Sequence, residues 1–96
     1  MANTFTFEAI KDPEAVLDYT IDWTPWLNLD TIISSTWSIT QTTPALTIDS
    51  DSFTVTGTTI WLSGGTRRKV YDVVNHITTA AGREDDRTIR FTITDK

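Results

Sequence analysis

Apolar and polar residues alternate along most of this chain, and this alternation constrains the fold more than any other feature. It is clearest in Leu17–Trp23, Ile33–Ile39, Tyr71–Ile77 and Ile89–Ile93, where apolar residues fall mainly on every second position. Side chains of a strand point alternately to its two faces, so such segments are typical of strands with one buried face. Threonine, which favours strands, makes up 20 of the 96 residues. No window shows a sustained helical period.

Turn signals divide the chain into about seven short strands, at the spacing found in β-sandwiches. The signals are Pro25, Pro44, Gly57, Ser63–Thr66 and Ala80–Asp85. We therefore predict an all-β, immunoglobulin-like β-sandwich, with residues 1–96 as a single domain and residues 1–12 as an N-terminal arm or edge strand. A small closed β-barrel is the alternative. Because the chain has no cysteine, apolar side chains must replace the disulfide of antibody domains.

Four tryptophans are more than a core of this size needs. Trp23 and Trp37 fall on inward-facing positions, and we expect Trp37 to be a central core residue. Trp26 lies in a connection, and Trp61 points away from the apolar face of its own strand. Exposed tryptophans are common anchors of interfaces, so Trp26 and Trp61 are candidate interface residues.

The sequence offers little for catalysis or for binding a metal or cofactor. His76 is the only histidine and lies in the middle of a strand, where a surface or interface role is expected. The acidic clusters Asp49–Asp51 and Glu84–Asp86 lack the ligand spacing of a calcium loop. We therefore predict no enzymatic activity, no cofactor and no metal site.

Charge is distributed unevenly along the chain. Residues 1–62 carry one base and eight acids, net −7, whereas residues 63–96 carry seven bases and five acids, net +2. Three of these bases, Arg67, Arg68 and Lys69, follow a Gly-Gly turn that we expect to form a hairpin tip. We predict that this triplet docks on an acidic surface of a partner or of a neighbouring copy. The acidic balance disfavours nucleic acid binding.

No membrane partner is expected either. Residues 31–48 contain no charge, but ten of these residues are Ser, Thr or Gln, which is too polar for a membrane span. The N-terminal ten residues lack the basic and apolar regions of a signal peptide.

Several segments resemble a known family in the family's order: residues 11–27 (KDPEAVLDYTIDWTPWL), 30–32 with 35–37, 61–66, and 75–83 with 85–89. Together they resemble the small fiber–tail adaptor proteins of tailed bacteriophages. The resemblance implies a virion structural protein of the tail, neck or baseplate, with an immunoglobulin-like fold and no enzymatic role. It also implies synthesis in the host cytoplasm. The implied partners are other virion proteins and, in a ring, copies of the same chain. The triplet Arg67–Lys69 is more basic than the family pattern leads us to expect.

A carbohydrate-binding or adhesion module is the alternative function, in which Trp26 or Trp61 would stack on a sugar. An exposed aromatic ring beside a shallow groove would favour the sugar-binding hypothesis. A flat apolar or charge-complementary patch would favour the adaptor.

Overall fold

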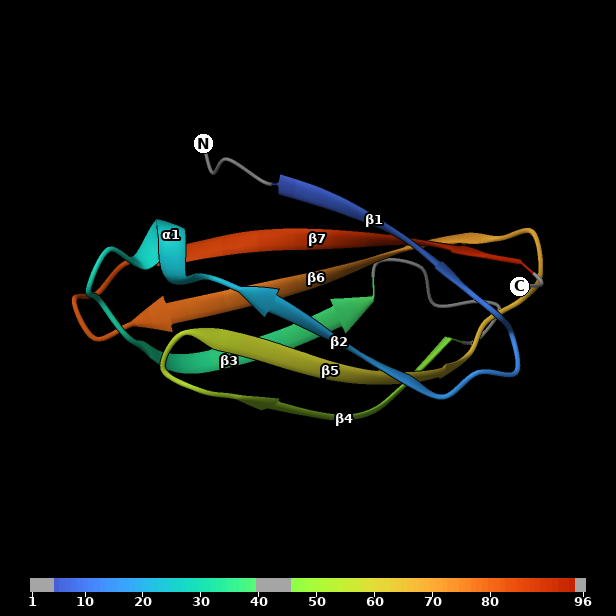
Figure 1. The fold of residues 1–96 in the computed structure, drawn as a ribbon, viewed down its shortest axis with the longest axis horizontal. Helices are drawn as coiled ribbons and strands as arrows, with labels where there is room; N and C mark the ends of the chain where they lie inside the picture. The colour runs from blue at the N-terminus through green and yellow to red at the C-terminus, as the bar shows by residue number, and fades with distance from the viewer. Residues whose placement is uncertain (1–4, 40–45, 95–96) are drawn as a thin grey trace.

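A computed structural model describes residues 5–39 and 46–94 of the chain. Its elements, in order, are β1 (Phe5–Lys11), β2 (Leu17–Asp22), α1 (Thr24–Leu27), β3 (Ile32–Ile39), β4 (Leu46–Phe53), β5 (Gly57–Gly64), β6 (Val70–Thr79) and β7 (Glu84–Ile93). The strands form a four-stranded sheet of order β1-β7-β6-β3 and a three-stranded sheet of order β2-β5-β4. The two sheets face each other along the long axis of the molecule (Figure 1).

The strand order confirms the predicted immunoglobulin-like sandwich, and the open sheets exclude the closed barrel for the described residues. The strand order β2-β5-β4 against β7-β6-β3 is the arrangement of a constant-type immunoglobulin domain. β1 pairs in parallel with β7 and lies at the edge of its sheet, whereas the other pairs are antiparallel.

The core lies between the sheets, because alternate residues of each strand point inward. Its buried apolar side chains are Ile21, Trp23, Leu27, Ile32, Leu46, Ile60, Leu62, Tyr71, Val73, Ile77, Ile89, Phe91 and Ile93. Buried and partly exposed residues alternate along the whole of β6, as the sequence pattern predicts.

Tyr71 fastens the start of β6 to the connection that precedes it. Its buried hydroxyl accepts a hydrogen bond of 3.0 Å from the backbone N–H of Thr66, five residues upstream. This arrangement is typical of immunoglobulin-like domains. Apolar residues, including Ile21 of β2 and Val73 of β6, fill the core where antibody domains carry a disulfide.

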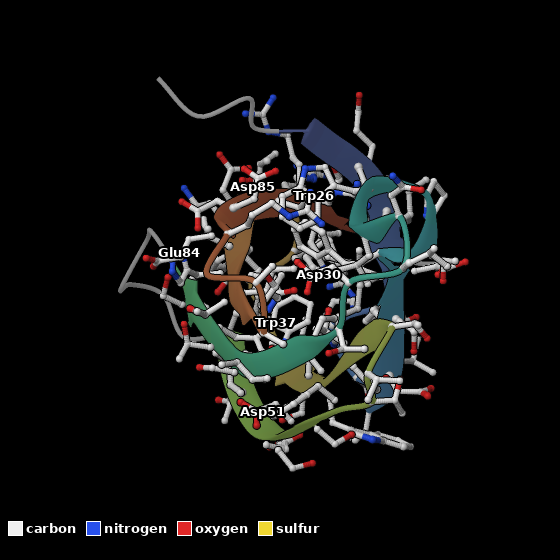
Figure 2. The ribbon with its side chains drawn as sticks, turned by 90° about the vertical axis from the view of Figure 1, so that its left-hand side faces the viewer. Trp26, Asp30, Trp37, Asp51, Glu84 and Asp85 are labelled. Atoms are coloured by element: carbon white, nitrogen blue, oxygen red, sulfur yellow. The ribbon has the colours of Figure 1, made fainter. Side chains whose placement is uncertain are left out.

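The prediction that Trp37 is a central core residue was wrong. Trp37 points between the sheets (Figure 2) but is only partly buried, whereas Trp23 is 0% exposed. Trp37 lies on β3, an edge strand, so neighbouring strands cover it from one side only. Leu17, at the start of the edge strand β2, is 39% exposed for the same reason.

Two local features have no clear signal in the sequence. The connection after Trp23 contains a single helical turn, α1, which begins with Pro25 in its first turn and ends at Asn28 in a left-handed conformation. A proline is tolerated there because the first helical N–H groups have no partner within the helix. Phe53 ends β4, and Val55 lies in the β4–β5 turn.

Candidate functional site

The predicted interface residues lie in three separate places. Trp26 belongs to one end of the sandwich, which we call the α1 end and define as residues 23–31, 54–56 and 80–83. Trp61 lies on the outer face of the three-stranded sheet. Arg67–Lys69 lie in the β5–β6 connection at the opposite end (Figure 1).

Trp26 is a packing residue of the α1 end rather than a free aromatic platform. Its ring meets Trp23 edge to face, with ring centroids 5.5 Å apart. The guanidinium of Arg83 lies 4.2 Å from the centroid of the Trp26 ring. Such a cation–π contact, together with the packing on Trp23, leaves Trp26 only partly exposed.

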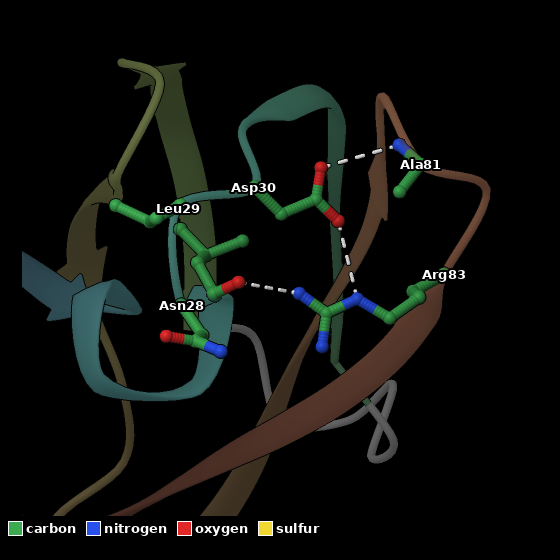
Figure 3. Close-up of a pocket in the computed structure, with 6 residues that line it drawn as sticks. Asn28, Leu29, Asp30, Ala81 and Arg83 are labelled. Carbon is green, nitrogen blue, oxygen red and sulfur yellow. Dashed lines mark hydrogen bonds and ion pairs between the residues drawn. The ribbon is translucent and has the colours of Figure 1, made fainter.

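Arg83 and Asp30 hold the loops of the α1 end together (Figure 3). Arg83 Nε donates to Asp30 Oδ2 at 3.1 Å, and its NH2 group donates to the carbonyl oxygen of Leu27 at 2.6 Å. Asp30 Oδ1 also accepts from the backbone N–H groups of Thr31, at 2.8 Å, and Ala81, at 3.2 Å. The β6–β7 hairpin is therefore fixed to the segment that follows α1.

These hydrogen bonds stabilise the charged form of Asp30. The pKa of Asp30 is lowered to about 2, first by a hydrogen bond from the Thr79 side chain and then by those from Thr31, Arg83 and Ala81. Hydrogen bonds to a carboxylate lower its pKa because the protonated acid cannot accept them equally well.

Asp30→Asn should therefore lower the melting temperature at neutral pH. A lowered pKa in the folded state contributes stability that is fully present above the unfolded pKa of 3.8 and is lost as the pH falls through about 2. We expect the difference in melting temperature between wild type and Asp30→Asn to shrink across this window. Thermal unfolding at a series of pH values would measure it. A difference that stays constant down to pH 2 would show that the carboxylate charge is irrelevant.

Leu29 is the most exposed large apolar side chain in the described residues, at 100%. It follows the left-handed Asn28 and has a φ of 75° itself, which is unusual for a leucine. Ile33 and Val55, 59% and 58% exposed, lie at the same end, where the N–H of Ile32 donates to the carbonyl oxygen of Val55. The α1 end therefore exposes apolar side chains on loops whose backbone is fixed by the hydrogen bonds of Arg83 and Asp30.

Trp61 occupies the middle strand of the three-stranded sheet and is 41% exposed. Asp18 of β2 and Ser50 of β4 are its neighbours in register and share the outer face. On the same face the hydroxyl groups of Thr20 and Thr59 are hydrogen-bonded at 2.9 Å. Trp61 is therefore an isolated aromatic ring on a polar face.

The predicted hairpin at Arg67–Lys69 was wrong, because β5 and β6 belong to different sheets. The segment crosses from one sheet to the other, and its three basic side chains are exposed. Its backbone is tied to the end of β7: the N–H of Arg68 donates to the carbonyl oxygen of Ile93 at 2.7 Å, and the N–H of Ile93 donates to that of Lys69 at 3.0 Å.

A buried lysine, which the sequence reading missed, supports the same connection. Lys11 is 0% exposed, and its Nζ donates to the carbonyl oxygens of Gly64, at 2.8 Å, and Asp12, at 3.0 Å. Burial lowers the pKa of Lys11. A lysine at the end of a strand is normally exposed, so the sequence gives no clear indication that Lys11 is buried.

His76 pairs with acidic residues across the β6–β7 ladder. Its Nε2 lies 2.8 Å from Glu84 Oε1, and its Nδ1 contacts Asp86. Hydrogen bonds to Asp86 and then to Glu84 raise the pKa of His76. Within residues 5–39 and 46–94 no group of three histidine or acidic side chains is arranged to hold a metal ion.

Three hollows on the described surface are lined by residues other than the candidate tryptophans. One lies at the α1 end, one between β1 and β2, and one along β1. Neither Trp26 nor Trp61 is among the residues that line these three hollows.

A rigid sandwich with clamped loops at one end and a basic connection at the other has the construction of a structural or binding module. The model of the family described as Podophage GP4 fiber-tail adaptor protein gp77 matches residues 11–92. The chain belongs to this family, as its sequence segments suggested. The match begins at Lys11, so most of β1 lies outside it. A fiber-tail adaptor is a structural component of a phage virion, which agrees with the prediction of a virion structural protein.

Comparison with solved structures adds support for the fold alone. A 2,6-sialyltransferase of Vibrionaceae Photobacterium sp. JT-ISH-224, solved with CMP and lactose, matches 96% of this chain with a TM-score of 0.59 and 9% identity. The chain covers only 18% of that enzyme's length. No curated protein matches the sequence. The described residues contain no helix with the length and hydrophobicity that a membrane crossing needs.

Proposed function

We propose that this chain joins a tail protein and a fiber protein of the virion, and that its α1 end is one of the two contact surfaces. The adaptor family supports the general role. The observation that carries the choice of surface is Leu29, a fully exposed leucine held in a left-handed conformation on a clamped loop.

An exposed, strained apolar residue is costly unless it serves a contact. The left-handed conformation costs an ordinary residue about 1–2 kcal/mol. Strain of this kind is concentrated at binding sites and other functional positions. Because Arg83 and Asp30 fix the loop, the backbone at Leu29 would lose little conformational freedom on binding, which favours affinity.

The variant Leu29→Gly tests this proposal, because it should change the stability of the domain and its binding in opposite directions. Glycine removes the left-handed strain of about 1–2 kcal/mol, but its freedom in the unfolded chain costs roughly 0.5–1 kcal/mol. We expect the free energy of unfolding to rise by about 0.5–1 kcal/mol, while incorporation of the variant or attachment of fibers to particles falls. Thermal unfolding and mass spectrometry of purified particles measure the two effects.

Val16→Gly is the matched control, since Val16 is 59% exposed but lies in the β1–β2 connection at the opposite end. We expect this variant to enter particles normally and to carry fibers. Normal fiber attachment by Leu29→Gly would show that the α1 end is not a contact surface.

A further inference from the structure

We propose that the outer face of the three-stranded sheet, centred on Trp61, binds the basic β5–β6 connection of a second copy of this chain. This contact joins copies to one another. It is additional to the proposed contact of the α1 end with another virion protein and does not depend on it.

The outer face of the three-stranded sheet, which we call the acceptor surface because it would receive the basic connection of the second copy, combines an aromatic ring with acidic charge. Trp61 lies on the middle strand with 41% of its surface exposed, and Asp18 is directly opposite on β2. On the other side, Asp49 of β4 accepts a hydrogen bond of 3.0 Å from Ser63, two residues beyond Trp61. Asp18 and Asp49 therefore flank the strand that carries the ring.

The three strands of this sheet carry four aspartates and no lysine or arginine. Asp18, Asp22 and Asp49 belong to the outer face, whereas Asp51 is in register with the buried Ile60 and belongs to the other face. A surface with this charge attracts a cationic partner and repels an anionic one. The other sheet differs, because its outer face contains the ion pair between Arg90 and Asp72, with Nε and Oδ1 2.9 Å apart.

The basic connection between β5 and β6, which we call the donor surface, would bind to the acceptor surface of the second copy. Arg68 and Lys69 are exposed, and within the described residues neither side chain forms an ion pair. The backbone that carries them is fixed by its hydrogen bonds to Ile93. Gly65, just upstream, packs so closely that a Cβ there would lie 2.9 Å from the side chain of Ile93.

A second copy is the occupant that matches this face, because the same chain supplies the complementary charge. Arginine already packs on tryptophan twice in this fold: Arg87 lies 4.1 Å from the Trp23 ring centroid, and Arg83 lies 4.2 Å from that of Trp26. An arginine or lysine of a neighbour can contact Trp61 in the same way while its charge faces Asp18.

The donor and acceptor surfaces are different parts of the molecule, so the contact is head-to-tail. Repetition of such a contact closes into a ring or continues as a filament. Each contact is small, but many in a closed ring reinforce one another. The structure therefore favours assembly of copies through a weak, salt-sensitive interface.

A charge-swap experiment tests the proposal. One variant carries Arg68→Glu and Lys69→Glu, and the other carries Asp18→Lys and Asp49→Lys. Sedimentation of the wild type should show association at low salt that weakens strongly at about 0.5 M salt, where charges are screened within a few ångströms. Each variant alone should associate at least tenfold more weakly, and an equimolar mixture should recover association, because opposite charges again meet at both surfaces.

Two further proteins make the result specific. Trp61→Ala should weaken association without unfolding the domain, since the side chain is on the outer face. The control Asp72→Lys with Arg90→Glu reverses the ion pair on the other sheet and should associate like the wild type. A wild type that stays monomeric at low salt up to about 1 mM would overturn the proposal. So would a mixture of the two swapped variants that remains dissociated. Fiber attachment by Leu29→Gly would be unaffected by either outcome.

Discussion

Trp23→Ala is expected to lower the free energy of unfolding by about 3–5 kcal/mol, the usual cost of removing a fully buried aromatic side chain. Domains of this size are stable by only about 5–15 kcal/mol, so the variant should be largely or partly unfolded at room temperature. Trp23 is 0% exposed, meets Trp26 edge to face, and lies under the guanidinium of Arg87. Its removal leaves a cavity that neighbours from both sheets cannot fill without moving.

Urea unfolding followed by circular dichroism measures this effect. Trp37→Ala is the matched control, because Trp37 also points inward but is only partly buried at a sheet edge. We expect Trp37→Ala to cost less than half as much as Trp23→Ala. Equal losses for the two variants would mean that the edge of the sandwich is packed as firmly as its centre.

The comparison of these tryptophans shows what the alternation pattern can predict. The pattern gives the side of the strand to which Trp23 and Trp37 point, because that depends only on local backbone geometry. It does not give the position of a strand within its sheet, which decides how many neighbours cover a side chain. Trp23 lies just beyond the end of β2 but is covered by α1 and β7, through contacts with Trp26 and Arg87.

The candidate surfaces were predictable to different extents. Exposure of Trp61 followed from its place opposite the apolar face of β5, and exposure of Arg67–Lys69 followed from their charge. Residues 67–69 connect strands of different sheets, and the sheet to which each strand belongs depends on its pairing with strands distant in the sequence. The local sequence therefore could not predict this connection. The contact of Arg83 with Asp30 joins residues 53 positions apart, so it could not be read from the sequence. The exposure of Leu29, on the loop that this contact fixes, could not be predicted from the sequence either.

A buried hydrogen-bond network joins the two sheets at Trp23, and Asn75 is its centre. Trp23 Nε1 donates to Asn75 Oδ1 at 3.1 Å, and the hydroxyl of Thr58 donates to the same oxygen at 2.6 Å. Asn75 Nδ2 in turn donates to Ser35 Oγ at 2.9 Å and to the carbonyl oxygen of Thr36 at 3.0 Å. The side chain thus connects β5 and the end of β2 with β3.

Asn75→Leu keeps the number and branching of the heavy atoms of this side chain but removes all four hydrogen bonds. A buried polar group left without a partner costs about 1–3 kcal/mol. The Thr58 hydroxyl loses its acceptor and Ser35 Oγ loses its donor, whereas Trp23 Nε1 keeps a hydrogen bond of 3.3 Å to Thr58 Oγ1. We therefore expect a loss of about 2–4 kcal/mol in the free energy of unfolding. In a Trp23→Phe background the indole N–H is already absent, so the same substitution should cost less. A coupling of roughly 0.5–3 kcal/mol is expected from residues in one network. Additive losses in this double-mutant cycle, measured by urea unfolding, would show that the hydrogen bond between Trp23 and Asn75 does not contribute to holding the sheets together.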